Sequence, residues 1–270
     1  MKKLKIAAVV RQVQERNEAL VLGELMEDLM NSTTERMALI TGASSGIGKA
    51  TALAFAQAGI GVALVSRSPD KLETVAQMAT SYGVKAKAYP LDLAKIFEVK
   101  QNISSLAADF GPIDILVNNA GMGYTGNIAD TSLSDWQQVI DLNLTSAFQC
   151  IGGILPMMRQ RRSGTIINVA SIGAIQVFPG WGAYCVSKFG LMALSKTLAA
   201  EERANGIRVT AICPGSVNTP LWDTDTVNAD FDREAMLTPE IVAQSILQTA
   251  LLPKTAVIEE LTLMPSAGTL

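Results

Sequence analysis

Residues 37–58 combine an apolar run, a glycine-rich turn and an alanine-rich segment, in that order. Met37–Ile40 predicts a short buried strand, and Thr41–Gly48 follows it with the spacing Gly-x-x-x-Gly-x-Gly. Glycines let the backbone turn tightly and approach a phosphate closely, and the helix that follows supplies N–H donors and a positive dipole end. The segment therefore predicts a βα unit that binds the phosphates of a nucleotide. An ordinary glycine-rich turn is the alternative.

Apolar and amphipathic segments alternate through the rest of the chain. Further strands are predicted at 61–66, 84–88, 113–117, 165–169, 208–213 and 257–263. Helices are predicted at 69–82, from near 94, at 134–158, 182–205 and 237–252. Such alternation is typical of an α/β fold whose parallel sheet is covered by helices on both faces. Residues 217–237 have no regular pattern, and we expect a flap over a pocket there, carrying Trp222 and Phe231.

Composition excludes several classes of function. The 270 residues are 49% hydrophobic and 17% charged, which suits a sizeable core, and the net charge of -3 gives no basic footprint for nucleic acid. The absence of histidine excludes Ser-His-Asp and Cys-His mechanisms and histidine metal ligands, and we expect no metal. Cys150, Cys185 and Cys213 are odd in number and lack Cys-x-x-Cys spacing, so we expect buried thiols in the cytoplasm. No run approaches the length of a membrane span.

Residues 1–36 read as an N-terminal extension. Leu22, Leu25, Met26 and Leu29 have helical spacing, so we expect one amphipathic helix at the periphery of the fold. A misassigned start, with translation beginning at Met30 or Met37, explains the segment equally well. We expect residues 37–270 to form a single domain.

Three short stretches are candidates for binding the rest of a dinucleotide. The second predicted strand ends in Ser66-Arg67-Ser68 without the acidic residue that would hold the ribose of NAD. Arg67 can pair with a 2′-phosphate instead, which favours NADP(H); a solvated loop arginine is the alternative. Asp92 either accepts from the adenine amino group or caps the helix near Ala94. Asn118-Asn119-Ala120-Gly121 either ties strand ends together or lines a ligand crevice.

Tyr184 and Lys188 are the candidates for acid–base chemistry. Residues four apart lie on one face of a helix, and a nearby ammonium lowers the pKa of a phenol from about 10, which would let it exchange a proton near neutral pH. Ser171 follows the predicted strand 165–169, at the sheet edge where ligands bind in open α/β folds. Asn143 lies inside a predicted helix, where asparagine is unfavourable, so we expect it to have a role.

The ordered set of motifs resembles the short-chain dehydrogenase/reductase family over about Met37–Met264. The motifs are Thr41-Gly-Ala-Ser-Ser-Gly-Ile-Gly48, Asn118-Asn-Ala-Gly121, Asn143, Ser171, Tyr184-x-x-x-Lys188 and Pro214-Gly215. The resemblance implies one doubly wound, Rossmann-like parallel sheet of about seven strands, in a single domain that carries both the cofactor site and the substrate site. It also implies Asn143, Ser171, Tyr184 and Lys188 as the catalytic residues. With the chemistry of the turn, it gives these cofactor-binding candidates: Gly42, Ser44, Ser45, Gly46, Ile47, Gly48, Arg67, Asp92, Leu93, Asn118, Asn119, Ala120, Gly121, Tyr184, Lys188, Pro214, Gly215, Val217 and Thr219.

We therefore expect an NADP(H)-dependent oxidoreductase that interconverts a carbonyl and a secondary alcohol. Tyr184 would exchange the proton, Ser171 would hydrogen-bond the oxygen, Lys188 would hold the ribose, and Asn143 would hold a water linked to Lys188. Thr219 matches the position that contacts the nicotinamide amide. By resemblance we expect a homodimer or homotetramer joined through the helices around Asn143 and Tyr184.

The substrate is less constrained by the sequence. The tail Glu259–Pro265, together with residues 237–240, resembles family members that act on small 3-hydroxy acids and assorted carbonyls. The alternative is a 3-oxoacyl-[acyl-carrier-protein] reductase, for which Arg159, Arg161 and Arg162 would dock an acidic carrier. Such a run is also typical of a solvated helix end. A non-catalytic NADP(H) sensor is a further alternative.

Overall fold

The computed structural model describes residues 36–229, 231–266 and 268. The helix predicted in the N-terminal extension falls on residues 1–35, outside the described residues. Its existence, and the division of the chain into an extension and a single domain, stay predictions.

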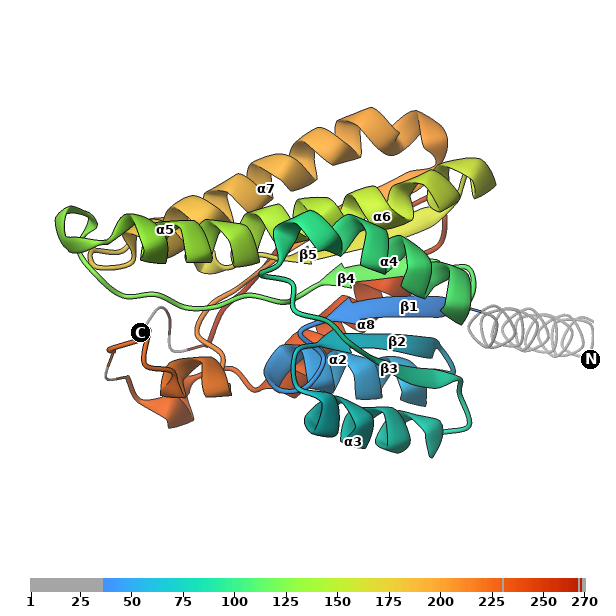
Figure 1. Ribbon diagram of the computed structural model, residues 1–270, viewed down its shortest axis with the longest axis horizontal. Coiled ribbons are helices and arrows are strands. Elements are labelled where there is room, and N and C mark those ends of the chain that lie inside the picture. The colour runs from blue at the N-terminus through green and yellow to red at the C-terminus, as the bar shows by residue number, and fades with distance from the viewer. Residues whose placement is uncertain (1–35, 230, 267, 269–270) are drawn as a thin grey trace, which may run out of the picture.

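Seven parallel strands form one sheet in the order β3-β2-β1-β4-β5-β6-β7. The prediction of a single doubly wound parallel sheet is confirmed (Figure 1). Strand order reverses direction between β1 and β4, so their carboxyl ends open a crevice there. The strands are β1 (Met37–Thr41), β2 (Gly61–Ser66), β3 (Ala86–Pro90), β4 (Ile115–Asn118), β5 (Gly164–Val169), β6 (Ile207–Pro214) and β7 (Glu260–Leu263).

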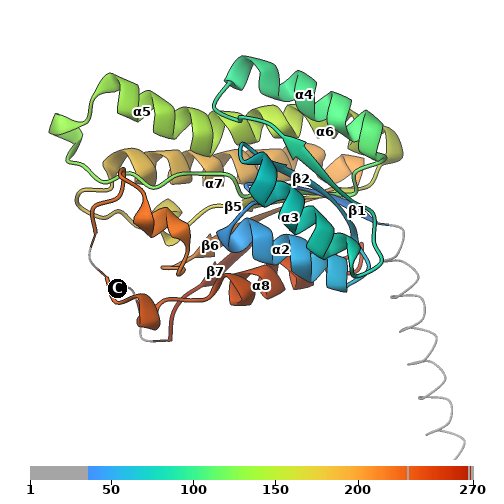
Figure 2. The ribbon, with the colours of Figure 1, turned by 60° about the horizontal axis from the view of Figure 1, so that its bottom comes forward.

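Helices cover both faces of the sheet, as Figure 2 shows from a second side. Successive residues of a strand point to opposite faces, so Ile40 packs with Phe55 under one layer while Leu39 packs with Ile154 under the other. The first layer contains α2 (Gly46–Gln57), α3 (Pro69–Thr80) and α8 (Pro239–Leu251). The second contains α4 (Ile96–Phe110), α5 (Leu133–Ile140), α6 (Ser146–Arg161) and α7 (Gly182–Glu202).

The helix predicted at 134–158 runs from Leu133 to Arg161 and is interrupted by a π-turn at Asp141–Thr145. Counted through the π-turn, Leu133–Arg161 is long and apolar enough to cross a membrane by length and composition alone. The expectation that no run approaches such a span is therefore wrong. The most apolar stretch of this helix is 44% buried inside the protein, as expected for a helix that packs along a core. Asn143 lies within the π-turn, where one extra residue widens the helix. Such turns occur frequently at functional sites.

Smaller differences from the predicted elements concern the residues at which three of them begin. β3 begins at Ala86 rather than Val84, β7 begins at Glu260 rather than Val257, and α4 begins at Ile96. β3 and β7 are the edge strands of the sheet, where pairing on one side only gives weaker definition of the ends. The flap predicted at 217–237 contains two short 3₁₀ turns, at Pro220–Asp223 and Arg233–Ala235, and its ends are paired through Val217 and Leu237.

Candidate active site

The glycine turn lies between the carboxyl end of β1 and the first turn of α2. Gly42 and Gly46 have φ of 65° and 51°, in the left-handed region that favours glycine. A Cβ on Gly48 would overlap the Gly42 carbonyl oxygen, so the turn can close this tightly only with glycine there. Ser45 precedes the helix in extended conformation, Ser44 comes before it in the turn, and Ile47 is the second residue of α2. The first N–H groups of α2 are therefore presented at the crevice.

Asn119 ties this turn to the end of β4. Its Nδ2 donates to the Thr41 and Gly42 carbonyl oxygens at 3.0 and 3.4 Å. In return, Thr41 Oγ1 accepts from the Asn119 and Ala120 backbone N–H groups, each at 3.0 Å. The neighbouring Asn118 donates to Asn168 Oδ1 in β5 at 2.8 Å. Of the two uses predicted for the asparagine pair, the tie between strand ends is present.

Tyr184 and Ser171 lie side by side. Ser171 follows β5 and accepts from the Gly173 N–H at 3.0 Å, which fixes the hydroxyl. A Cβ on Gly173 would lie 3.2 Å from Tyr184 Cε1 and 3.4 Å from Ser171 Oγ, so glycine leaves the space between the two side chains open. The Ser171 side chain also hydrogen-bonds the phenol. Tyr184 is half-buried in the first turn of α7.

Lys188 lies one turn further along α7 and is buried. Its Nζ donates to the Val169 carbonyl oxygen at 3.0 Å and lies 5.7 Å from the centroid of the Tyr184 ring. A Cβ on Gly121 would lie 3.1 Å from Asn143 Oδ1 and 3.6 Å from Lys188 Nζ. The structure therefore brings Lys188, Asn143 and Gly121 together at the end of β4.

Burial controls the acid–base properties of Tyr184 and Lys188. Burial raises the pKa of Tyr184 to about 12, and the hydrogen bond with Ser171 only partly offsets this rise. Burial lowers the pKa of Lys188 to about 8. The prediction that Lys188 brings the phenol pKa below 10 is therefore wrong for the chain alone, because loss of hydration outweighs an ammonium that faces Val169. Near neutral pH Tyr184 is a phenol and Lys188 is mostly an ammonium.

The Asn143 side chain is used inside the protein. Its Nδ2 donates to the Met122 carbonyl oxygen and to Ser187 Oγ, both at 3.0 Å, and its Oδ1 accepts from the Met122 N–H at 2.8 Å. Both N–H groups are thus occupied. The side chain joins the π-turn to α7 and to the segment after Gly121, and any donation to a water would have to come from another group.

Two of the residues predicted for the adenosine end differ in their surroundings. Arg67 is exposed after β2 and forms no hydrogen bond or ion pair within the described part of the chain. Asp92 Oδ1 accepts from the Ala94 N–H at 3.0 Å in the turn before α4, but Asp92 does not cap that helix, whose N-cap residue is Lys95, so the capping alternative given above is wrong. Leu93 is buried against the second helix layer.

The segment after β6 approaches the glycine turn. A Cβ on Gly46 would lie 3.1 Å from Thr219 Cγ2, so Thr219 lies beside the start of α2. Pro214 ends β6, and Gly215 lies under Met264 and Pro265, where a Cβ would lie about 3 Å from each. Val217 is buried and its carbonyl oxygen accepts from Trp222 Nε1 at 2.8 Å.

One contributor was not singled out from the sequence. Ser187 accepts from Asn143 and donates to the Tyr184 carbonyl oxygen at 2.7 Å, so it joins Asn143 to the first turn of α7. The only sequence signal for Ser187 was its place within one turn of Tyr184. Trp181, an apolar residue expected at the substrate pocket, lies edge-on to Tyr184 with ring centroids 5.5 Å apart. In the described residues no group of three histidine, cysteine or acidic side chains could hold a metal ion.

The basic run at the end of α6 is engaged within the protein. Arg159 pairs with the buried carboxylate of Glu202. Arg161 donates to the Ile113 carbonyl oxygen and pairs with Asp114 at 3.2 Å. Arg162 donates to the Ala204 carbonyl oxygen at 2.6 Å. These contacts join α6 to the chain around β4 and α7. All three arginines are nevertheless exposed at the end of α6, which agrees with the solvated helix end that the sequence suggested.

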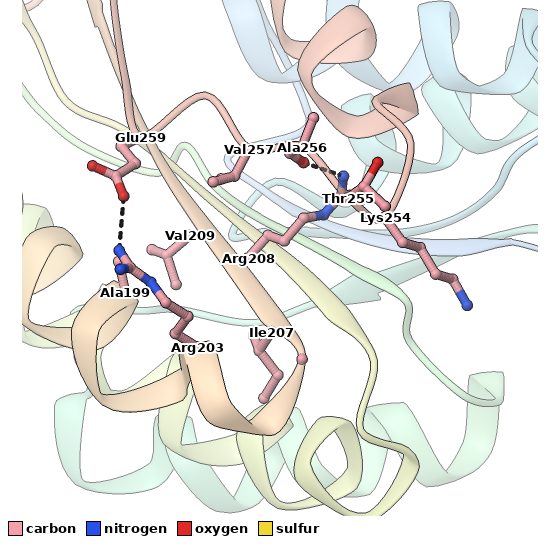
Figure 3. Close-up of a pocket in the computed structure, with 11 residues that line it drawn as sticks. Ala199, Arg203, Ile207, Arg208, Val209, Lys254, Thr255, Ala256, Val257 and Glu259 are labelled. Carbon is pink, nitrogen blue, oxygen red and sulfur yellow. Dashed lines mark hydrogen bonds and ion pairs between the residues drawn. The ribbon is translucent and has the colours of Figure 1, made fainter.

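A groove of about 280 Å³ lies at the opposite, amino-terminal edge of the sheet (Figure 3). Arg208 caps the end of α8 there, donating to the Leu252 and Ala256 carbonyl oxygens at 2.8 and 2.9 Å. Arg203 pairs with Glu259 at 2.9 Å. None of the predicted site residues lines this groove.

The family described as short chain dehydrogenase matches residues 36–229. A D-beta-hydroxybutyrate dehydrogenase of Rhizobium meliloti is 39% identical over 214 residues, which are 78% of this chain and 82% of that protein. A 3-oxoacyl-[acyl-carrier-protein] reductase of Synechocystis is 38% identical over 202 residues, 74% of this chain and 81% of that protein. An alcohol dehydrogenase of the archaeon Thermococcus sibiricus, solved with 5-hydroxy-NADP, superimposes with a TM-score of 0.78 at 29% identity, covering 86% of this chain and 97% of that one.

Proposed function

The chain belongs to the short-chain dehydrogenase family, and from that premise we propose that it is an NADP(H)-dependent oxidoreductase that interconverts a carbonyl compound and a secondary alcohol. The observation that carries the proposal is the meeting of Tyr184 and Ser171 beside Gly173, with Lys188 one helical turn away. A phenol and a hydroxyl that reach one point can both hydrogen-bond a single substrate oxygen.

The residues at the crevice fit a phosphorylated dinucleotide. A Cβ on Gly48 or Gly42 would fill space next to Asn119, so the glycines keep the backbone open where a pyrophosphate would approach the start of α2. Arg67 is exposed and unengaged within the described residues, as a partner for a 2′-phosphate has to be. Thr219, beside Gly46, would reach the nicotinamide amide. When bound, the cofactor supplies the hydride.

The chain's own residues would handle the proton and the charge. Because the pKa of Tyr184 is about 12, the phenol holds its proton at neutral pH and can give it from Oη to the carbonyl oxygen as the alcohol forms. The Ser171 hydroxyl, held by the Gly173 N–H, would donate a hydrogen bond to that oxygen as charge grows. Lys188 would hold the cofactor ribose and add positive charge below Tyr184. These properties favour reduction, since oxidation would need Tyr184 as the phenolate.

Asn143 is proposed as a positioning residue. Its side chain ties the π-turn to Met122 and Ser187, and Ser187 in turn holds the carbonyl of Tyr184. In this role it would set the position of Tyr184 and Lys188 relative to the segment after Gly121. Asp92 and Leu93 would border the adenine, with one oxygen of Asp92 kept by the local turn.

A second candidate function is favoured by similarity: the Synechocystis relative is named a 3-oxoacyl-[acyl-carrier-protein] reductase. Against it, the three arginines that would dock an acidic carrier are engaged with Glu202, Asp114 and backbone carbonyls. We rank it below a reductase of free carbonyl compounds.

The assembly we propose is a homodimer or homotetramer joined through α5–α6 and α7. Phe148, Val186 and Phe189 are large apolar side chains on these helices, and each is between 41% and 56% exposed. We infer a cytoplasmic location from the three cysteines, all of which are buried free thiols.

The experiment is a carbonyl screen that follows oxidation of NADPH and of NADH, with acyl-thioesters, small keto acids and aromatic ketones as substrates. We expect turnover of free carbonyl compounds with NADPH. Preference for acyl-thioesters on a carrier protein would establish the second candidate. No turnover of any class, with NADPH binding retained, would leave a non-catalytic sensor.

The cofactor choice is tested separately. Replacing Arg67 with alanine should weaken NADPH binding roughly ten- to hundred-fold, because a charge-assisted contact to phosphate is lost, and should hardly change NADH binding. Arg203→Ala, an exposed arginine at the opposite edge of the sheet, is the control. Equal loss for both cofactors in Arg67→Ala would show that the residue does not read the phosphate.

A further inference from the structure

Four aromatic rings form a continuous row that begins at Tyr184. The ring centroids of Tyr184 and Trp181 lie 5.5 Å apart, those of Trp181 and Trp222 lie 5.8 Å apart, and those of Trp222 and Phe231 lie 5.4 Å apart. Every pair is edge-to-face, the geometry that favours attraction between aromatic quadrupoles. The row therefore joins the first turn of α7 to the flap after β6.

Local contacts hold these rings in place. Trp181 precedes α7 and is paired with Gly126, and its carbonyl oxygen accepts the Cys185 N–H at 2.8 Å. Trp222 donates from Nε1 to the Val217 carbonyl oxygen. All three non-catalytic rings are only half-buried, so they are not part of the closed core.

Apolar surface continues beside the row. Ile128 is 67% exposed and packs on Gly182, the first residue of α7, while Val177 on the preceding loop is 71% exposed. An apolar group placed against Trp181 would therefore meet aromatic and aliphatic carbon.

The charges around the row disfavour an anionic substrate. Arg233 is the flap's one cation in its described residues, and it is engaged by Asn218 Oδ1 at 2.9 Å, by the Thr219 carbonyl oxygen at 3.0 Å and by Asp223 at 3.0 Å. Asp225, Asp232 and Glu234 add three more carboxylates, all exposed. The Lys188 ammonium donates to the Val169 carbonyl oxygen at 3.0 Å. A substrate carboxylate beside the row would therefore find no unengaged cation among the described flap residues or Lys188, and the flap's carboxylates outnumber its one arginine.

We propose that the aromatic row selects uncharged carbonyl substrates with a flat apolar group next to the carbonyl, and that Trp222 is its specificity-determining residue. This inference rests on the proposed function and narrows its substrate class. It departs from the small 3-hydroxy acid suggested by the C-terminal tail of the sequence, because a 3-oxo acid carries the carboxylate that the site does not accommodate.

The test uses four compounds that separate ring from charge. Two carry a phenyl group on the carbonyl: 1-phenyl-1,2-propanedione and benzoylformate. The other two, 2,3-butanedione and pyruvate, carry a methyl group at that position. Benzoylformate and pyruvate have a carboxylate where the two diones have an acetyl group. We expect kcat/KM with NADPH to be at least about ten-fold higher for phenyl than for methyl, and at least about ten-fold lower for carboxylate than for acetyl.

Trp222→Ala should lower the phenyl-to-methyl ratio of kcat/KM roughly ten-fold, because a phenyl group loses more contact with the removed ring than a methyl group does. Trp222→Phe keeps an aromatic ring and should keep most of the preference. Phe97→Ala removes a ring that is 94% exposed on α4, so it should change neither the phenyl-to-methyl ratio nor kcat/KM for any of the four compounds. NADPH binding and thermal unfolding of each variant show that the fold and the cofactor site persist.

The two levels of the argument fail differently. Turnover in which pyruvate or benzoylformate is the preferred substrate, or a phenyl preference unchanged in Trp222→Ala, would overturn the substrate class and leave the oxidoreductase intact. No turnover of these compounds or of the wider carbonyl screen would overturn the oxidoreductase and the substrate class together.

Discussion

Lys188 is expected to reduce the stability of the fold that it serves. Its side chain is buried, with the residue 5% exposed, and one hydrogen bond to Val169 is recorded for its ammonium. Burial lowers the lysine pKa from 10.5 to about 8. The unfolded chain therefore binds this proton more tightly than the folded chain. The penalty is fully present below about pH 8 and disappears as the pH rises through 10.5.

Replacing Lys188 with methionine removes this penalty while keeping an unbranched chain of similar length. The pKa shift corresponds to about 3 kcal/mol near pH 7 and about 1 kcal/mol near pH 10. Loss of the hydrogen bond to Val169 offsets about 1 kcal/mol at every pH. We therefore expect Lys188→Met to be about 2 kcal/mol more stable than the parent near pH 7 and nearly equal to it near pH 10.

The assay is urea unfolding of the cofactor-free protein at several pH values between about 7 and 10, with linear extrapolation of the unfolding free energy. Lys71→Met, at an exposed position on α3, is the control and should show no such trend. The reasoning would be refuted if the difference in unfolding free energy between Lys188→Met and the parent did not change with pH. It would also be refuted if the variant's advantage over the parent were smaller near pH 7 than near pH 10. A more stable but inactive variant would show that Lys188 is kept for function.

Three further outcomes follow from particular contacts. Gly48→Ala places a methyl group against the Gly42 carbonyl oxygen and Asn119, so the affinity for NADPH should fall at least about ten-fold in a fluorescence titration. The control is Gly152→Ala, whose methyl group would make only ordinary contacts with Lys100 and should leave the affinity for NADPH unchanged. Glu202→Gln should lower the unfolding free energy by roughly 1 kcal/mol, since the partner Arg159 is half exposed and screened by solvent. Arg159 holds the pKa of the Glu202 carboxyl below its usual value, so this contribution should be lost as the pH falls through the lowered pKa, which acid unfolding would show. In the direction of reduction, kcat/KM should be flat near neutral pH and fall as the pH rises through about 8, where Lys188 loses its charge; a profile that stays flat well above that pH would contradict the role of Lys188.

The parts of the fold that local pattern controls were predictable from the sequence. The strand–turn–helix around Gly42–Gly48 is encoded by neighbouring residues, since glycine spacing and apolar runs act over a few positions. The same holds for the doubly wound sheet. The strand edges at Val84 and Val257 were placed less well because the outer strands have one partner each.

Properties that depend on contacts distant in sequence were not predictable. The spacing of Tyr184 and Lys188 correctly put them one turn apart, yet the direction of the phenol pKa shift follows from burial, which no local pattern shows. The unfavourable position of Asn143 predicted a role for it without indicating which residues it contacts. Its partners, Met122 and Ser187, are 21 and 44 residues away and appear only in the folded chain.

The central claim is that the Tyr184 phenol passes its proton to the oxygen of a carbonyl substrate. The direct measurement is single-turnover oxidation of NADPH by the Tyr184→Phe variant and the parent, with the best substrate of the screen, beside NADPH binding by titration. We expect the rate to fall by roughly a thousand-fold while the NADPH dissociation constant changes by no more than about two-fold, since the ring remains and only its hydroxyl is lost. A rate within about ten-fold of the parent, with binding intact, would contradict the claim.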